Sequence, residues 1–428
     1  MATAKKSWLQ LLGPGLLFAG AAVGVSHLVY STRAGANYGF GLVWLVLLAN
    51  LFKYPFFEFG PRYASATGHS LLEGYQKLGK WVLALFGLIT IGTMFTVQAA
   101  VTLVTASLAV NIFGITDSLL IWVCILLLIC SGLLVVGRYK LLDNLMKFII
   151  ITLTVVTLVA VFMAFSNQVG EISFTQQFSI GGAHLAFVIA FMGWMPAPLD
   201  LSVWHSLWTL EKQKQSKAEF DIKQSLFDFN IGYIGTTFLA LFFMSLGALV
   251  MYHSGEQFSP KGTVFAKQLI ELYTNTLGQG AGTFIALAAF ITMFSTTITC
   301  LDALPRSMAR AHYLFLGEGA SISLDEPDEQ GKTSLEMPKS YYWGWLVVLM
   351  LGALLILSML LTNMATFLMI ATILSFLTAP FFAIANYILV TKHIEPEHRP
   401  PLATRILSIL GIAYLFIFCA IYIWSLVG

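Results

Sequence analysis

The sequence GWMPAP at residues 193–198 interrupts a long apolar run. Pro196 and Pro198 cannot both lie in an unbroken helix, because each lacks a backbone N–H and its ring clashes with the preceding turn. A second apolar run, near the N-terminus, contains Gly20 and the tetrapeptide GVSH at residues 24–27. Irregular backbone at membrane depth is tolerated only where it is buried in protein or lines a cavity. The two interruptions therefore predict two broken membrane helices that meet at an internal site.

The composition is that of a membrane protein. Hydrophobic residues make up 58% of the 428 residues and charged residues 10%, and the mean hydropathy is +0.81. A soluble domain carries about 25% charged residues. Breaks at corresponding places in two halves of such a chain indicate the substrate site of a transporter built from inverted repeats. A net charge of +2 gives no sign of nucleic-acid binding. The four cysteines lie in apolar runs, which favours neither a disulfide framework nor a cysteine metal site.

Eleven apolar runs reach about the 20 residues that a bilayer requires. We predict transmembrane segments at 10–31, 41–59, 82–112, 118–137, 143–165, 183–208, 225–252, 281–304, 341–361, 364–390 and 402–426. The domain boundaries that follow are two five-helix repeats, at 10–165 and 183–390, and an eleventh helix at 402–428.

Lysine and arginine residues set the predicted orientation, because they gather on the cytoplasmic side of membrane proteins. Nearly all of them fall at one set of helix ends, which includes the tail at 1–9 and the acidic loop at about 315–340. The other ends carry only Arg33, Lys261 and Lys267. This asymmetry predicts a multi-pass protein of the inner cell membrane with a cytoplasmic N-terminus and an external C-terminus. Lys53 lies within the second segment, and we expect it to snorkel toward the membrane surface.

Several motifs resemble the Nramp family of divalent-metal transporters, and together they cover residues 10–390. The most specific are GPG at 13–15, AGANYG at 34–39, LLANLFKY at 47–54 and TGHSL at 67–71. Further matches are GRYKL at 137–141, MP at 195–196, STTIT at 295–299 and APF at 379–381. The resemblance implies an all-α membrane protein of the LeuT type. In that fold five helices are repeated in inverted topology, and the broken first and sixth helices move against a scaffold.

The positions that supply the family's metal ligands are substituted in this chain. Gly24 stands where the resemblance implies an aspartate, and His27 where it implies an asparagine. Met195 is retained, but Ala197 and Pro198 replace the histidine and asparagine that follow it. A hard dication such as Mn²⁺ or Fe²⁺ needs several oxygen or nitrogen donors to replace its hydration. The remaining set, Met195 with His27, would compensate a buried dication poorly.

The family's other functional positions are also changed. Its two proton-carrying acids fall on Ala99 and Thr102, and its tenth-segment glutamine falls on Thr378. The substrate-binding candidates at the two breaks and beside them are Gly24, Ser26, His27, Trp194, Met195, Ala197, Asp200 and Thr378. Polar groups at this depth are costly and usually face a cavity. His27 is alternatively a packing histidine bonded to a carbonyl. Asp200 is expected to pair with His27, His205 or Arg33 or to accept the coupling ion, and the alternative is a buried structural ion pair.

Five further residues are candidates for ion coupling or a proton path. They are Gln98, Thr102, Thr296, Thr297 and His205. In LeuT-type folds hydroxyls of the eighth segment commonly serve a sodium site beside the first segment, which gives the two eighth-segment threonines that role. Hydroxyls in membrane helices also often bond back to the carbonyl four residues earlier. Asp302 and Arg306 have the spacing of an ion pair within one helix.

These observations predict a secondary transporter that works by alternating access in the lipid bilayer. We find no phosphate-binding GxxxxGK[ST] pattern, so a gradient would drive it, without a cofactor. The favoured substrate is a small solute or a cation other than Mn²⁺ and Fe²⁺. The first alternative is a proton-coupled transporter of Mn²⁺, Fe²⁺ or Mg²⁺ with substituted ligands. The second alternative is a membrane protein that no longer transports. An enzyme is disfavoured, because no nucleophile–base pair is visible. The sequence leaves the oligomeric state open, a monomer included.

Overall fold

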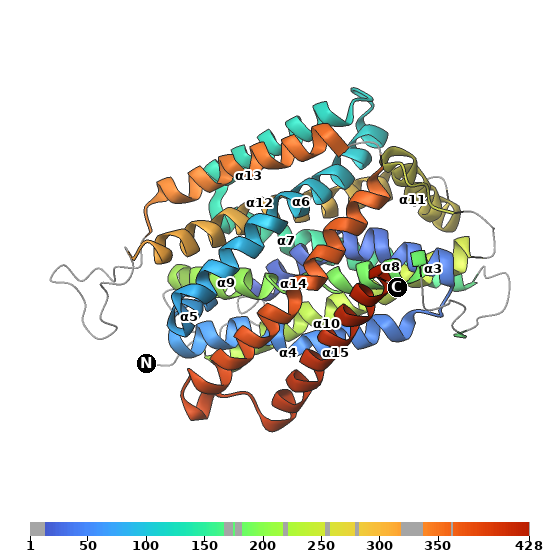
Figure 1. The fold of residues 1–428 in the computed structure, drawn as a ribbon. Helices are drawn as coiled ribbons and strands as arrows, with labels where there is room; N and C mark the ends of the chain where they lie inside the picture. The colour runs from blue at the N-terminus through green and yellow to red at the C-terminus, as the bar shows by residue number, and fades with distance from the viewer. Residues whose placement is uncertain are drawn as a thin grey trace, which may run out of the picture.

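The structure is a computed structural model. It describes residues 13–166, 174–175, 182–216, 221–252, 257–278, 282–317, 337–360 and 363–427. The regular elements in these ranges are all helices, and they pack side by side in one bundle (Figure 1). Eight of the described helices or helix runs are long and apolar enough to cross a membrane. The all-α membrane class is therefore confirmed, while the count of eleven spans stays a prediction.

Both predicted interruptions are present. The first segment consists of α2 (Pro14–Ala22), the π-helix η1 (Val25–Ser31) and α3 (Thr32–Tyr38), with the break at 23–24. The sixth consists of α8 (Gly182–Trp194) and α9 (Leu201–Ser216), separated by residues 195–200. We call these two stretches the first break and the sixth break.

The other helices complete the bundle around these two. They are α4 (Val43–Thr67), α5 (Leu71–Leu78), α6 (Lys80–Phe113), α7 (Leu119–Ser166), α10 (Ile222–Leu246), η2 (Gly247–Met251), α11 (Gly262–Leu277), α12 (Gly282–Phe315), α13 (Lys339–Leu360), α14 (Met364–Lys392), η4 (Pro396–His398) and α15 (Leu402–Val427). The predicted tail at 1–9 and most of the loop at 315–340 lie outside the described residues.

Three elements differ from the sequence prediction. The segments predicted at 118–137 and 143–165 form a single helix, α7. The reason is that residues 138–147 are mostly good helix formers and contain no proline. Helix α11 lies in the stretch 253–280, between the seventh and eighth predicted transmembrane segments, where the sequence analysis proposed no element. The short helix α5 was also missed. Its capping box, Ser70 with Glu73, is a start signal that the sequence does contain.

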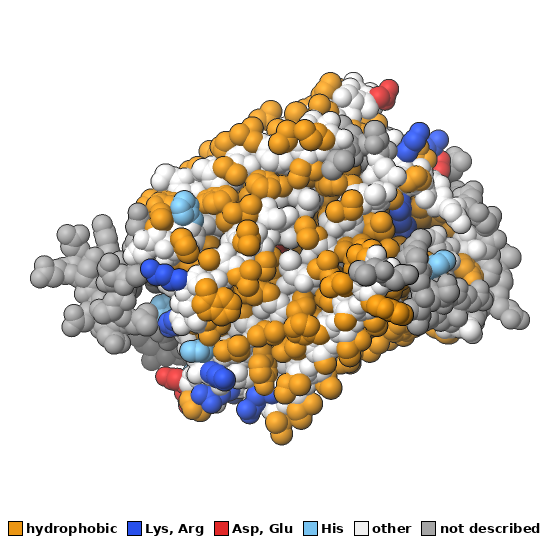
Figure 2. All heavy atoms as spheres, viewed as in Figure 1, with side chains coloured by type: hydrophobic (Ala, Val, Ile, Leu, Met, Phe, Trp, Pro, Cys, Tyr) orange, Lys and Arg blue, Asp and Glu red, His pale blue; other side chains and the backbone are white. Residues whose placement is uncertain are grey.

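The surface of the bundle supports its placement in a bilayer. Hydrophobic side chains cover the flank seen in Figure 2, and charged side chains gather toward the two ends of the helices. Large apolar residues such as Leu128, Phe162 and Trp424 are exposed on helices that would meet lipid. A soluble protein rarely exposes so continuous an apolar surface.

Inside the bundle, the first segment is anchored at its start. Asp228 of α10 accepts hydrogen bonds from the backbone N–H groups of Gly13 at 3.0 Å and Gly15 at 2.7 Å. A carboxylate is favourable there, because the first N–H groups of a helix lack partners and carry partial positive charge. Farther along α2, Phe18 is fully buried and makes edge contacts with Phe57 and Phe229. These contacts hold the first break at a fixed depth in the bundle.

Candidate functional site

A small cavity of about 20 Å³ lies where the two breaks meet. Its walls come from both breaks and from α6 and α12. The site candidates that line it are Ser26, Trp194, Ala197 and Thr296. The remaining lining residues are Ala21, Ala22, Val25, Val97, Val101, Pro196, Pro198, Leu201, Trp204 and Cys300. The cavity therefore offers hydroxyl, thiol, indole and apolar surface, and no carboxylate or imidazole is among its described lining residues.

The first break is closed by a hydroxyl. Thr296 Oγ1 of α12 lies 3.1 Å from the carbonyl oxygen of Gly20 and 3.2 Å from that of Val23, within hydrogen-bonding distance of both. It also lies 3.2 Å from the carbonyl oxygen of Thr292 on its own helix. The same side chain crowds Gly24, because a Cβ added there would lie 2.7 Å from Thr296 Oγ1. Position 24 therefore has no room for a side chain unless Thr296 moves.

A serine joins the two breaks. Ser26 Oγ donates to the carbonyl oxygen of Ala22 at 2.7 Å and lies 3.2 Å from that of Pro196. It also lies 2.7 Å from Nδ1 of His27. The other ring nitrogen of His27, Nε2, lies 2.9 Å from the carbonyl oxygen of Thr236 on α10. His27 is thus directed at a neighbouring helix and does not line the cavity.

The sixth break is closed by a buried lysine that the sequence analysis misplaced. Lys53 of α4 is fully buried, so the expected snorkelling is wrong. Its Nζ donates to the carbonyl oxygens of Met192 at 2.5 Å, Gly193 at 2.9 Å and Ala197 at 3.3 Å. The helix stops there, so its last carbonyls lose their regular helical partners, although the Met192 carbonyl still accepts from the Met195 N–H at 3.4 Å. The three donors of the ammonium suit such a group of carbonyls. A charge in the middle of an apolar run was the signal that could have marked Lys53 as a site residue.

Asp200 is buried just before α9, and its Oδ1 has no hydrogen-bond partner in the described part of the chain. It interacts electrostatically with Lys53. The pairings expected from the sequence are not the ones observed, since Arg33 donates to the carbonyl oxygen of Ser259 at 2.7 Å. His205 is fully buried, and neither of its ring nitrogens has a described partner. It packs against the ring of Phe18, with the centroids 5.7 Å apart.

The remaining coupling candidates form a polar seam between α6 and α12. Gln98 Nε2 donates to Thr102 Oγ1 at 3.1 Å, and it lies 3.4 Å from the carbonyl oxygen of Thr297. The Thr297 hydroxyl lies 2.7 Å from that of Thr105. On α14, the Thr378 hydroxyl bonds back to the carbonyl oxygen of Ser375 at 3.1 Å. Met195 is buried and is not among the cavity-lining residues.

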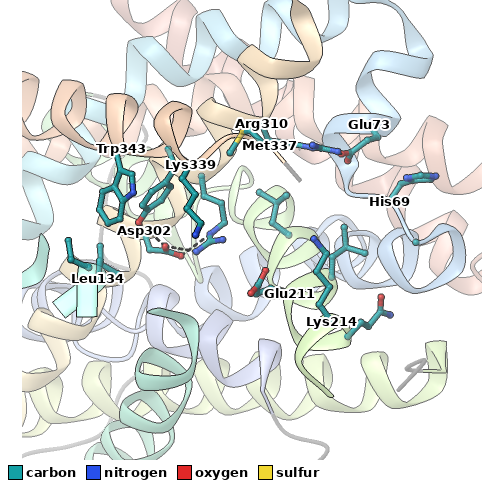
Figure 3. Close-up of a pocket in the computed structure, with 17 residues that line it drawn as sticks. His69, Glu73, Leu134, Glu211, Lys214, Asp302, Arg310, Met337, Lys339 and Trp343 are labelled. Carbon is teal, nitrogen blue, oxygen red and sulfur yellow. Dashed lines mark hydrogen bonds and ion pairs between the residues drawn. The ribbon is translucent and has the colours of Figure 1, made fainter. Parts of the chain in front are cut away.

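A larger cavity of about 780 Å³ opens at the end of the bundle that is predicted to be cytoplasmic (Figure 3). Asp302 pairs with Arg306 at 2.7 Å, which confirms the predicted ion pair, and accepts from the Tyr342 hydroxyl at 3.0 Å. Glu73 pairs with Arg310 at 2.5 Å. Figure 3 shows Glu211 and Lys214 of α9 across the cavity from Asp302. His69 lies in the turn before α5, where burial lowers its pKa from the usual value.

Acidic and histidine side chains close enough to share a metal ion are found in the described residues at one place. Glu395, Glu397 and His398 meet in the turn between α14 and α15, where both carboxylates are exposed. Exposed acidic groups of this kind are common and do not by themselves make a site.

The arrangement of the helices is that of a known class of membrane transporter. One similar solved structure is a point mutant of the manganese transporter of Eremococcus coleocola, with a TM-score of 0.74 and 16% identity, covering 99% of this chain and 89% of that one. Another is MhsT in complex with L-phenylalanine, with a TM-score of 0.58 and 13% identity, covering 98% of this chain and 100% of that one. At these identities the likeness shows the fold, which is LeuT-like.

The family follows from the sequence comparison. A model of the natural resistance-associated macrophage protein-like (Nramp) family matches residues 15–425. An uncharacterized protein of Pasteurella multocida is 36% identical over 431 residues, covering 99% of this chain and 95% of that protein. The chain belongs to the Nramp family, so it is a multi-pass membrane transporter and not an enzyme.

Proposed function

We propose that this Nramp-family transporter works by alternating access and carries a small solute other than Mn²⁺ or Fe²⁺. The observation that carries the proposal is the lining of the central cavity. Its polar side-chain groups are the hydroxyls of Ser26 and Thr296, the thiol of Cys300 and the indole N–H groups of Trp194 and Trp204, which donate hydrogen bonds and cannot ligate a cation. A divalent cation entering a low-dielectric site needs anionic or strongly donating ligands to repay the loss of its hydration. This lining supplies none.

Two further contacts support the same conclusion. The crowding of Gly24 by Thr296 leaves no space for a carboxylate at the position where the family resemblance implies one. At the sixth break the carbonyl oxygens of Met192, Gly193 and Ala197 already receive the Lys53 ammonium. A cation approaching those oxygens would meet a like charge, and at about 4 Å such repulsion costs roughly 4 kcal/mol at an effective dielectric of 20.

One observation favours the alternative, a proton-coupled divalent-metal transporter with substituted ligands. Asp200 is a buried carboxylate close to the sixth break, and its Oδ1 has no described partner. A movement of α9 toward the cavity would bring that oxygen to a bound cation. The fold likeness to a manganese transporter is consistent with this alternative and does not decide the substrate.

The test is uptake by purified protein in proteoliposomes with a pH-sensitive dye inside. We expect no saturable Mn²⁺ uptake above that of empty liposomes and no linked acidification. Asp200→Asn and Met195→Ala serve as comparison variants, because each removes one conceivable metal ligand. Saturable Mn²⁺ uptake with acidification, abolished by either substitution, would establish the metal alternative and overturn the proposal.

A further inference from the structure

A second cavity, of about 290 Å³, lies at the end of the bundle opposite the cavity in Figure 3. It is formed by η1 and α3 of the first segment and by the N-terminal parts of α8 and α14. The labels of α3 and α8 lie together on the right of Figure 1. The topology prediction makes this the external side. We call it the outer cavity.

The outer cavity contains one formally charged side chain among its described lining residues, Arg33, and no carboxylate. One guanidinium nitrogen, Nη2, donates to the carbonyl oxygen of Ser259 at 2.7 Å. The guanidinium carbon lies 4.9 Å from the ring centre of Phe265, so one face of the group is stacked on an aromatic ring. Nε has no hydrogen-bond partner in the described residues. A guanidinium has five N–H donors. Most of these donors have no acceptor among the described residues, and no described carboxylate pairs with the positive charge.

The walls beside Arg33 are aromatic. The rings of Tyr30 and Tyr38 lie 5.8 Å and 5.5 Å from that of Phe187. The Tyr38 hydroxyl lies 2.9 Å from Nδ1 of His184, so this rim is held by a hydrogen bond. Flat apolar walls favour a flat apolar ligand, which stacks on them or meets them edge to face. The volume is at the lower end of the range for ligand pockets, so a ligand of modest size fits.

We propose that the outer cavity binds a small monocarboxylate with a flat or aromatic body. Its carboxylate lies against Arg33, and its body lies against the aromatic wall formed by Tyr30, Tyr38 and Phe187. The charge that Arg33 places in a partly desolvated cavity attracts anions and repels cations. The fork of N–H donors matches a carboxylate geometrically. The inference rests on the proposed function, because it places an anion-attracting site on the way to a central cavity that suits no dication.

Binding to the purified full-length protein tests the proposal, with benzoate, benzamide and benzylammonium as probes in isothermal titration calorimetry. The three probes share a ring and differ in charge. We expect benzoate to bind at least tenfold more tightly than benzamide, and benzylammonium to show no binding. The comparison needs no variant. Equal affinities for benzoate and benzamide, or binding of benzylammonium, would overturn the proposal.

Two variants then locate the site. Arg33→Gln should weaken benzoate binding at least tenfold. Lys261→Gln, which removes an exposed positive charge near the start of α11 and outside the cavity lining, should leave it unchanged. Asn37 lines the cavity. Benzoate should therefore slow the reaction of the Asn37→Cys thiol with an impermeant thiol reagent at least fivefold, as followed by mass spectrometry. Binding without this protection would move the site elsewhere and overturn the proposal.

The Mn²⁺ uptake assay separates this inference from the proposed function. If benzoate neither binds nor protects and Mn²⁺ is not carried, the outer site is wrong and the proposed function stands. If benzoate protects the Asn37→Cys thiol while Mn²⁺ is carried, the outer site stands and the proposed function is wrong.

Discussion

At both broken helices a side chain from a neighbouring helix contacts backbone carbonyls near the break, but the two side chains differ in chemistry. At the first break the free carbonyls of Gly20 and Val23 face a neutral hydroxyl from Thr296. At the sixth break three carbonyls face the ammonium of Lys53. Each break also presses a glycine against a neighbour. A Cβ on Gly24 would lie 2.7 Å from the Thr296 side chain, and one on Gly193 would lie 2.1 Å from the backbone carbonyl oxygen of Thr372.

The difference concerns charge. Unsatisfied backbone carbonyls in a membrane interior cost several kcal/mol in lipid, so both breaks need partners. A hydroxyl supplies one at little cost. A buried ammonium brings a charge that must itself be compensated, and Asp200 is the carboxylate that interacts with it electrostatically. We infer that the sixth break depends on a buried charge and the first break does not.

The largest expected effect comes from removing that charge. Lys53→Met removes the ammonium from all three carbonyls and takes away the positive charge that acts on Asp200. Because breaking a buried pair strands the surviving charge, we expect a loss of about 3–5 kcal/mol in stability. The melting temperature of purified protein in detergent measures it. Lys223→Met, which removes an exposed lysine near the start of α10, is the control and should melt as the wild type does.

A double-mutant cycle sharpens the same point. Asp200→Asn should be less damaging on the Lys53→Met background than on the wild type, since the stranded charge is then gone. If Lys53→Met melts like the wild type, or if the two substitutions simply add, the sixth break does not depend on charge and the comparison fails.

The second largest expected loss of stability comes from crowding at the first break. Gly24→Ala places a methyl group against Thr296, and overpacking of this kind costs about 1–3 kcal/mol. On a Thr296→Ala background the clash is relieved, so the pair of substitutions should cost less than their sum. Gly193→Ala has no such relief, because its neighbour is backbone. Thermal melts of the four proteins check this. Strict additivity at position 24 would show that Thr296 does not close the first break.

The fold was predictable where a residue violates helix geometry. Pro196, Pro198 and Gly24 disfavour a continuous helix, and the two breaks lie where these residues indicated. Helix α5 could also have been predicted, since Ser70 and Glu73 form a local start signal. Helix α11 was missed because its 16 residues are amphipathic and fall in a stretch read only for membrane spans. The continuity of α7 reflects local propensity, which hydropathy ignores.

The site was only partly predictable, because several of its contacts join residues that are far apart in the sequence. Ser26, Trp194, Ala197 and Thr296 line the cavity, as their places at the breaks or beside them suggested. The partners of Lys53 are backbone carbonyls some 140 residues away, and no side-chain pattern announces them. The direction of His27 toward Thr236 is equally non-local. A sequence places a polar residue at a depth in the membrane, but it does not say which neighbour the residue faces.

The smallest expected effect tests the neutral partner by itself. Thr296→Val keeps the shape of the side chain and removes its hydroxyl, so the carbonyls of Gly20 and Val23 lose a partner while the packing against Gly24 stays. Because a hydrogen bond contributes about 0.5–1.5 kcal/mol, we expect a loss of that size, well below the effect of Lys53→Met. Thr292→Val on the same helix is the matched control, since its hydroxyl bonds only to the carbonyl of Ala288 four residues earlier. It should change the melting temperature less than Thr296→Val does. If Thr296→Val destabilises as much as Lys53→Met, the neutral hydroxyl contributes as much as the ammonium and the first break is no simpler than the sixth. If it destabilises no more than Thr292→Val, the hydroxyl is not what closes the first break, and the crowding of Gly24 by the rest of the Thr296 side chain must account for the closure.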